Sequence, residues 1–421
     1  MSFGRSVAQA ALRSPPLAPF QVRSFRFQFP ADLLTSWGGE MENVILGWYI
    51  LSATGSVLLL TLFASMQYVG TLLAPMIGLG GDRLGHRSVL CAMRAVYAAL
   101  AAGIAALTFC GWLSPLVVFM LAGMAGLVRP SDLAMRGALV AETMPTDRFV
   151  GAMGASRITS DAARIAGPLT GSALFATFGI GPAYLAIGLV YLTGFLLTLG
   201  TGAPRRLMAP PQVFAFWRDM RAGVAYVWAD PASLAALLLA FLVNFTAYPL
   251  STGLLPYVAQ NIYHVDQTGL GYLVASFATG SLLGSVVVSL AARAIRPARM
   301  MLGFAIAWYA MLLVFVQMPD PVHGRAALLL AGLAQNLSLV PMSVLLLYGA
   351  DQQFRGRVMG LRMMAIYGLP LGLMLAGALI DRVGFATAIS LLASVGAALT
   401  VAIGLRWRTA LWPREAPANA R

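Results

Sequence analysis

The sequence contains no lysine, only two cysteines and three histidines, and few charged residues of any kind. Charged side chains make up 10% of its 421 residues, whereas a typical soluble domain has about 25%. Hydrophobic residues make up 59%. A chain with so little charge cannot cover a water-facing surface, so the composition predicts a polytopic membrane protein.

Each of these absences excludes a kind of site. Without lysine the chain cannot form a phosphate-binding loop that ends in Gly-Lys-Ser/Thr, which argues against direct ATP hydrolysis. Cys91 and Cys110 are too few for a disulfide framework or a thiolate metal site, and the histidines are scattered. We therefore expect no metal, no cofactor and no enzymatic activity.

Apolar runs long enough to cross a bilayer, about 20 residues each, occur about twelve times. We place them near residues 31–54, 56–80, 88–109, 113–136, 150–176, 181–202, 232–258, 267–292, 300–318, 325–348, 357–379 and 384–406. This pattern predicts an all-α polytopic membrane protein with twelve transmembrane helices.

The basic residues set the topology. All 28 are arginine. Those outside the spans gather in alternate connections, while the opposite connections carry only Arg325 and Arg382. Arginine-rich loops face the cytoplasm, so both termini are expected there, in the cytoplasmic (inner) membrane of a bacterium. The net charge of +13 then reflects topology and attraction to anionic lipid rather than binding of nucleic acid.

The longest break between spans is the Pro- and Arg-rich stretch Gly202–Gly223. It divides the chain into two predicted six-helix bundles with short flanking segments. The predicted parts are a basic N-terminus (1–27), a first bundle (28–202), a central loop (203–224), a second bundle (225–407) and a tail (408–421). Spans five and eleven both have an Arg/Gly-rich entry and a mid-span Pro flanked by glycines, which indicates a duplication of six spans.

The most specific motif is GLGGDRLGHR, in the turn between spans two and three. Glycine suits a tight turn between helices. Arg83 and Arg87 can lie near negative helix ends or lipid phosphates. The motif residues are Gly78, Asp82, Arg83, Gly85 and Arg87.

With this motif, the spans, the central break and the repeat, the sequence resembles the major facilitator superfamily from about residue 28 to 408. His86 is a mild departure from the family's loop pattern, and the second copy, AARAIRPARM, lacks the acid. The resemblance implies two six-helix bundles working by alternating access. It also implies that Asp82, with Arg83 and Arg87, latches the two halves together in one access state.

Span five contains ARIAGPLTGS, which is similar to the Gly-Pro motif of the superfamily's exporters. Gly167, Pro168 and Gly171 match, while Ala163 and Ser172 replace the outer glycines. These small residues and the proline predict a close-packed, slightly kinked helix at the interface between the halves. Generic packing of small residues is the alternative explanation.

Charged and polar residues inside the spans are candidates for function, because such charges must face a cavity or each other. Arg157, Asp161 and Arg164 share one face of span five, and Asp161 could simply neutralise either arginine. In the family, spans one, four, seven and ten line the cavity. The resemblance therefore places Glu40 or Glu42, Arg129 and Asn244 nearest a substrate, with Asn43, Asp161 and Arg164 as further candidates.

Glu40 and Glu42 point about 200° apart on a helix, so they cannot both face one cavity centre. Asp32, Ser36, Gly39, Asn43 and Gly47 lie on the Glu40 side. This stripe favours Glu40 as the protonatable, substrate-facing acid. Glu42 is then expected to pair with a buried arginine, with Arg157 or Arg164 as the candidate partner.

These features together predict a secondary transporter, most simply a proton-coupled exporter of a small organic molecule such as a drug, siderophore or metabolite. Its partners would be that substrate, protons and the lipid bilayer, and the chain is expected to be monomeric. An importer or facilitator of a small solute is the alternative. A membrane sensor or intramembrane enzyme is more remote, since the chain offers neither a sensing domain nor a convergent catalytic set.

Overall fold

The computed structural model describes residues 17–73, 77, 80, 81, 83–202, 216–290 and 296–412. Within these residues the regular secondary structure is entirely helical. The chain forms two compact units, each of which is described separately. Unit 1 comprises Met1–Ser56, Met66–Ala209 and Val265–Ala275, and unit 2 comprises Val57–Ser65, Pro210–His264 and Ser276–Arg421.

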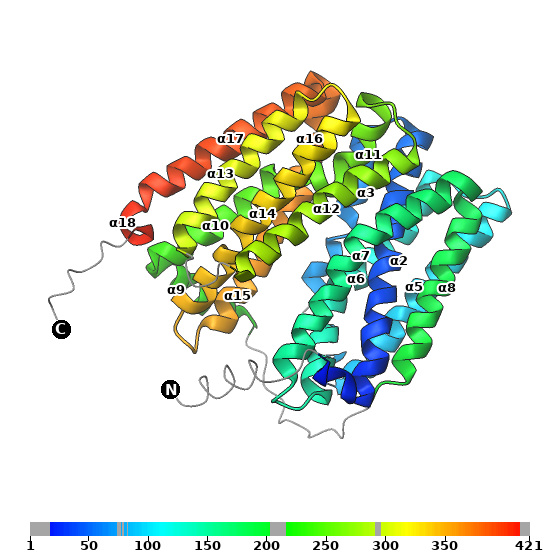
Figure 1. Cartoon of the computed structure of the whole chain (residues 1–421), viewed down its shortest axis with the longest axis horizontal. Helices are drawn as coiled ribbons and strands as arrows, with labels where there is room; N and C mark the ends of the chain where they lie inside the picture. Colours follow the sequence, from blue (N-terminus) through cyan, green and yellow to red (C-terminus); the bar gives the residue numbers. More distant parts are fainter. Residues whose placement is uncertain are drawn as a thin grey trace. The chain divides into compact units, whose positions relative to one another are not determined.

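Unit 1 is built around a long first helix. That helix, α2 (Arg23–Thr54), packs against α7, α8 and α6, and α5 packs against α8. Figure 1 shows α2, α7 and α8 running side by side. The other helices of this unit are η1 (Ala18–Gln21), η2 (Val69–Leu73), α5 (His86–Phe109), α6 (Pro115–Thr143), α7 (Phe149–Phe178) and α8 (Ile180–Leu199).

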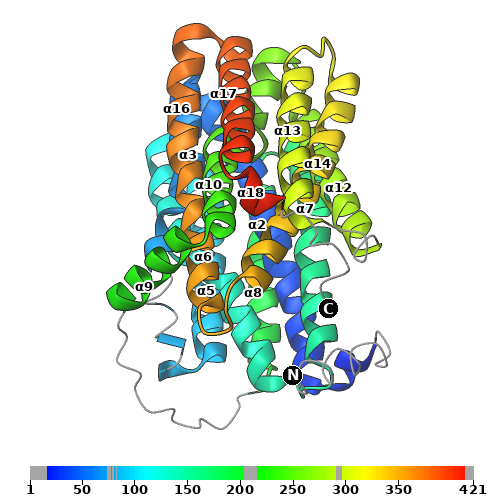
Figure 2. The same ribbon diagram turned by 90° about the vertical axis from the view of Figure 1, so that its left-hand side faces the viewer.

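Unit 2 holds the later helices, and in it α13 packs against both α14 and α17 (Figure 2). Span seven is one helical run whose hydrogen-bonding pattern changes along its length. It begins with α10 (Pro231–Thr246) and continues through two π-helical turns, η3 (Leu250–Leu254) and η4 (Val258–Ile262), on either side of α11 (Leu255–Tyr257). The remaining helices are α9 (Phe216–Ala229), α12 (Gln267–Leu290), α13 (Pro297–Val316), α14 (Pro321–Gly349), α15 (Arg355–Met364), η5 (Ala365–Tyr367), α16 (Gly368–Val383), α17 (Phe385–Arg406) and α18 (Arg408–Leu411).

Nine helical segments in the described part of the chain are long and apolar enough to cross a membrane. Two further helices, α2 with 32 residues and α7 with 30, are long enough but carry the intramembrane charges. The apolar stretch Val57–Thr71, which begins with α3 (Val57–Met66), is shorter. Together these segments account for the twelve predicted spans, so the all-α polytopic fold is confirmed.

Several local predictions differ from the structure. The predicted central loop (203–224) is helical from Phe216 onward, while residues 203–215 lie outside the described part. The predicted tail begins with the helical turn α18. The first helix starts at Arg23, eight residues before the predicted span. In this added part, Phe25 is buried against Val140, Met144 and Ala152, which stabilises the extra turns.

Three spans begin with the same local signal, a capping residue followed by proline. Ser114, Asp230 and Asp320 each accept hydrogen bonds from backbone N–H groups of the first turn, and Pro occupies the first helical position of α6, α10 and α14. Proline fits there because its missing N–H would lack an intrahelical partner anyway. At the start of α14, hydrogen bonds from the backbone and ring of His323 lower the pKa of Asp320.

Glycine permits close helix contact in unit 2. A Cβ added to Gly332 in α14 would lie 2.1 Å from the carbonyl oxygen of Phe277 in α12. Without water in the bilayer to drive association, helices gain stability from such close approach of small residues.

We expect Gly332→Ala to lower the free energy of unfolding in detergent by about 1–3 kcal/mol, because the added methyl group forces the two backbones apart. Gly303→Ala is the matched control, since a Cβ there meets nothing within 4 Å and alanine favours a helix by about 1 kcal/mol. Equal stability of the two variants, measured by denaturant unfolding, would contradict this packing.

Candidate functional site

Glu42 lies in a polar cluster within unit 1. Arg129 of α6 contacts its carboxylate at 2.5 Å, and the Tyr191 hydroxyl of α8 donates to the same oxygen at 2.9 Å. The other Arg129 nitrogen donates to Asn43 Oδ1 at 2.9 Å. The Glu42 side chain is 8% exposed and that of Arg129 is 24% exposed. The charge of Glu42 is therefore neutralised by direct, charge-assisted hydrogen bonds.

This arrangement corrects one expectation. The sequence suggested Arg157 or Arg164 as the partner of Glu42, but the structure pairs Glu42 with Arg129. Asn43 also differs, because the helical-wheel analysis put it with Glu40, whereas Arg129 binds it together with Glu42. One guanidinium has several N–H groups and can reach two adjacent positions of a helix.

Glu40 has a different environment. Its nearest cation is Arg164 of α7, whose Nε lies 4.0 Å from the carboxylate, and its side chain is 29% exposed. Arg164 is itself more than half exposed. The two glutamates of α2 are thus held differently, one by short hydrogen bonds and one by a long ion pair.

Asp161 of α7 pairs with Arg157 at 3.4 Å, one helical turn away. Its side chain is 15% exposed, while that of Arg157 is 59% exposed. The contact is local to α7, so it places Asp161 beside an arginine of its own helix rather than beside Glu40 or Glu42.

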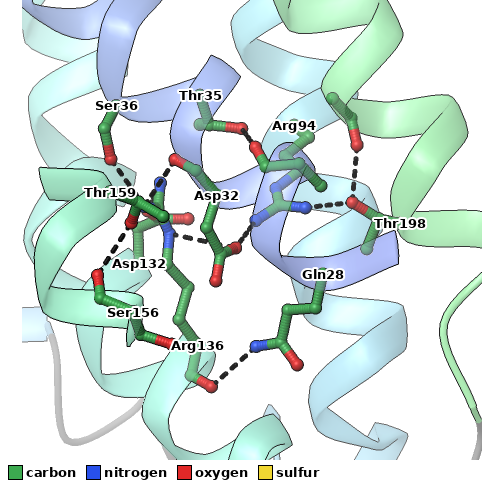
Figure 3. A network of polar contacts seen from close by, with 12 residues as sticks. Gln28, Asp32, Thr35, Ser36, Arg94, Asp132, Arg136, Ser156, Thr159 and Thr198 are labelled. Carbon is green, nitrogen blue, oxygen red and sulfur yellow. Dashed lines mark hydrogen bonds and ion pairs between the residues drawn. The ribbon is translucent and has the colours of Figure 1, made fainter. Parts of the chain in front are cut away.

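A second charged network lies in unit 1 (Figure 3). Asp32 of α2 contacts Arg94 of α5 and lies 3.6 Å from Nε of Arg136 of α6. Arg136 also pairs with Asp132, one turn earlier in α6. Two acids and two arginines therefore balance one another, and the Arg94 and Asp32 side chains are 0% and 1% exposed.

Hydroxyl and amide groups complete this network. Arg94 also donates to the Thr198 hydroxyl of α8, and Arg136 donates to the Ser36 hydroxyl at 2.7 Å and to the Asp32 carbonyl oxygen at 3.0 Å. Gln28 donates to the carbonyl oxygen of Arg136 at 3.0 Å. The network thereby joins α2, α5, α6 and α8 (Figure 3).

The sequence pattern alone does not predict this network. It placed Asp32 on a polar stripe without a partner and left Arg94 out. A signal existed, because Arg94 is a lone charge within the apolar run 88–109, and an ionisable residue inside a span is expected to be paired or functional.

Unit 2 holds its polar groups differently. Asn244 in α10 donates to the carbonyl oxygen of Ala240 in its own helix at 2.8 Å. Asn336 in α14 donates to Ser281 in α12. Within the described part of unit 2, four acidic residues lie at helix ends or in turns: Asp230, Asp320, Asp351 and Asp381.

The loop motif is described in part. Gly78 and Asp82 lie outside the described residues, so the proposed latch acid has no structural account. Gly85 has φ +90°, a conformation that favours glycine. Arg87 donates to the carbonyl oxygen of Leu199 at the end of α8, where a cation complements the helix dipole. Arg83 is exposed, and His86 contacts Glu142 at 2.6 Å.

The Gly-Pro motif of α7 packs directly on the helix that carries the glutamates. A Cβ on Gly167 would lie 2.6 Å from Cβ of Glu40, and one on Gly171 would lie 2.7 Å from Cα of Met41. The same segment also meets α12, where a Cβ on Gly271 would lie 3.0 Å from the carbonyl oxygen of Pro168. The motif therefore forms a close contact with α2 at the level of Glu40.

The helical fold, with charged residues in its first span, defines a class, the polytopic membrane proteins. A family model of the Major Facilitator Superfamily matches residues 29–370, and the chain belongs to this superfamily. No curated protein sequence matches the chain.

Solved structures share the fold at low sequence identity. The nucleoside transporter NupG has a TM-score of 0.65 at 15% identity, over 93% of this chain and 100% of that one. A bacterial homologue of the human lysosomal transporter Spinster has 0.67 at 14%, over 94% and 96%. A D-xylose-proton symporter has 0.63 at 12%, over 96% and 97%.

We expect Arg94→Leu to lower the free energy of unfolding by about 3–5 kcal/mol, because it leaves the buried Asp32 charge without its closest partner. Arg157→Leu is the control, since it breaks a more exposed ion pair and should change stability by about 1 kcal/mol or less. Unfolding in detergent micelles measures both. A loss for Arg94→Leu no larger than for the control would contradict the structural role of the network.

Proposed function

We propose that the chain is a proton-coupled secondary transporter that exports a small organic molecule by alternating access, with Glu40 as the group that carries the proton. The observation that supports this proposal is that the two glutamates of α2 lie at different distances from their arginine partners. Glu42 has a 2.5 Å contact with Arg129, whereas the nearest Arg164 nitrogen lies 4.0 Å from Glu40.

Glu42 is suited to a fixed role. Adding a proton to it would leave the Arg129 charge largely uncompensated among half-buried groups, which is costly in a site of low dielectric. Its function in the proposal is to hold Arg129 and Asn43 in place. Arg129 can then offer its remaining N–H groups to an anionic or hydrogen-bonding part of the substrate.

Glu40 is suited to a changing role. Protonation there weakens a long ion pair with a more than half-exposed arginine, so less electrostatic energy is lost than at Glu42. Glu40 also lies where Gly167 of α7 packs on α2. A change of charge at this contact can therefore alter the packing of the two helices, which links proton binding to a change of conformation.

Asp161 and Asn244 take secondary roles in the proposal. Asp161 holds Arg157 on the same helix as Arg164, so it tunes the local field without carrying the proton. Asn244 donates its amide to its own helix, which leaves its side-chain carbonyl as a group for a substrate. The loop residues Gly78, Asp82, Arg83, Gly85 and Arg87 would latch the access state.

Export is inferred from the likeness of the Gly-Pro motif to that of exporters. Uptake is the second candidate, and it is favoured by the structural similarity to a D-xylose-proton symporter. The arginine distribution supports a protein of the bacterial cytoplasmic membrane with both termini in the cytoplasm, and we propose that it is a monomer. Everted vesicles distinguish the directions, because an exporter releases lumenal protons on adding substrate and a symporter does not.

The test uses everted vesicles that hold an acidic lumen, a pH-sensitive dye and a panel of lipophilic cations, nucleosides, dipeptides and pentoses. We expect at least one compound to release protons through the wild type. Glu40→Gln should reduce this release about tenfold or more, because it cannot take up a proton. The same variant should retain substrate counterflow, which needs no net proton movement.

Glu42→Gln should reduce both proton release and counterflow, because Arg129 loses its carboxylate partner. Asp161→Asn is the matched control, and it should retain coupling within about threefold. Normal proton release by Glu40→Gln would remove Glu40 from the mechanism. Compound-dependent flux that is indifferent to an uncoupler would remove proton coupling altogether.

A further inference from the structure

A groove of about 410 Å³ lies in unit 2. It is bounded by α13, α17 and α18, which Figure 2 shows side by side. Several of its lining side chains, among them Ile306, Val401 and Leu405, are 37%, 44% and 67% exposed. The groove therefore opens on the surface of this unit rather than into its core.

Most of the groove is apolar and open. Ile306, Val401 and Leu405 line its sides, and Gly303 leaves a gap in the wall, since a Cβ there would meet nothing within 4 Å. Its volume lies within the roughly 300–1,000 Å³ of small-ligand pockets. A hydrocarbon chain fits such a surface, because nothing in it would compete for hydrogen bonds.

One end of the groove is cationic. Arg299 lies in the first turn of α13 and Arg408 at the start of α18, and both side chains are exposed. Among the described residues, neither arginine forms an ion pair with an acid. The first turn of α13 contains no acidic residue, so the positive end of its dipole adds to the same field.

Trp412 marks this end as a membrane interface. It lines the groove, and its indole lies 3.8 Å from the position of a Cβ on Gly404 of α17. Tryptophan is enriched at the level of lipid headgroups, where one part of the ring is apolar and another can donate a hydrogen bond. The arginine distribution predicts that this end of unit 2 faces the cytoplasm.

We propose that this groove binds one anionic glycerophospholipid, with its phosphate at Arg299 and Arg408 and an acyl chain along Gly303, Ile306 and Val401. The combination selects this ligand. A free phosphate would leave the apolar groove unused, and a zwitterionic lipid would bring no net charge to the two arginines. The proposal requires only that the chain lies in a membrane, and it is independent of the direction or coupling of transport.

The experiment is native mass spectrometry of the full chain purified in a mild detergent, titrated with phosphatidylglycerol, phosphatidylethanolamine or inorganic phosphate. We expect one phosphatidylglycerol to be retained at least tenfold better than phosphatidylethanolamine. Arg299→Gln combined with Arg408→Gln should abolish this preference. Gly303→Leu should reduce retention of phosphatidylglycerol at least fivefold, because it fills the groove and leaves both arginines in place.

Arg406→Gln is the control, since Arg406 ends α17 but stacks over Trp407 and does not line the groove. It should retain the wild-type preference. Equal retention of the two lipids by the wild type would overturn the proposal. So would a preference that survives loss of both arginines, and so would displacement of the lipid by inorganic phosphate alone, which would indicate a headgroup site without a chain.

Unfolding curves of each variant distinguish a loss of lipid binding from a loss of folding. Arg299 and Arg408 are exposed and Gly303 faces open space, so no variant should unfold more readily than the wild type when no lipid is added. With phosphatidylglycerol added, the wild type and Arg406→Gln should be stabilised, whereas the groove variants should not. Stabilisation of every variant by phosphatidylglycerol would also overturn the proposal.

Discussion

A charge inside a membrane span must be neutralised by the protein itself, because the surrounding hydrocarbon offers neither water nor counterions. In unit 1 this constraint is met by α2. Its Asp32 contacts Arg94 and Arg136, and its Glu42 contacts Arg129. Each of these arginines comes from a different helix or a different turn, so neutralising the charges of α2 also fixes the neighbouring helices around it.

The same constraint separates structural charges from a charge that can change. The Asp32 network is closed, since its two acids and two arginines are paired within the unit and nearly inaccessible. The Glu42 cluster is more open, because Arg129 is 24% exposed. Glu40 has the longest ion pair of the three sites on α2. Along one helix, the pairing therefore weakens from Asp32 to Glu42 to Glu40, which is why we propose Glu40 as the group that carries the proton.

Sequence reasoning reached the fold because the signals for spans are local: apolar length, arginine-rich loops, and capping residues followed by proline. It singled out Glu40, Glu42 and Arg129 because charges are rare inside the spans, but it left out Arg94. It could not assign partners. Glu42 meets Arg129 because α2 packs beside α6, and Asp32 meets Arg94 because α5 packs beside α6 and α8, which both contact α2. That neighbourhood is a property of the packed helices. The helical wheel also treated side chains as points, although an arginine is long enough to bridge Glu42 and Asn43.

The Gly-Pro motif of span five packs α7 closely against α2. On the sequence, Gly167 and Gly171 indicated close packing at the interface between the two predicted halves. In unit 1 they let α7 approach the backbone of α2 at Trp37, Glu40 and Met41. Since Arg164 precedes Gly167 by one turn of the same helix, α7 supplies both the small residues that touch α2 and the cation that faces Glu40. A shift of α7 along α2 would therefore change the Glu40–Arg164 distance directly, so the packing of these two helices and the strength of this ion pair cannot vary independently.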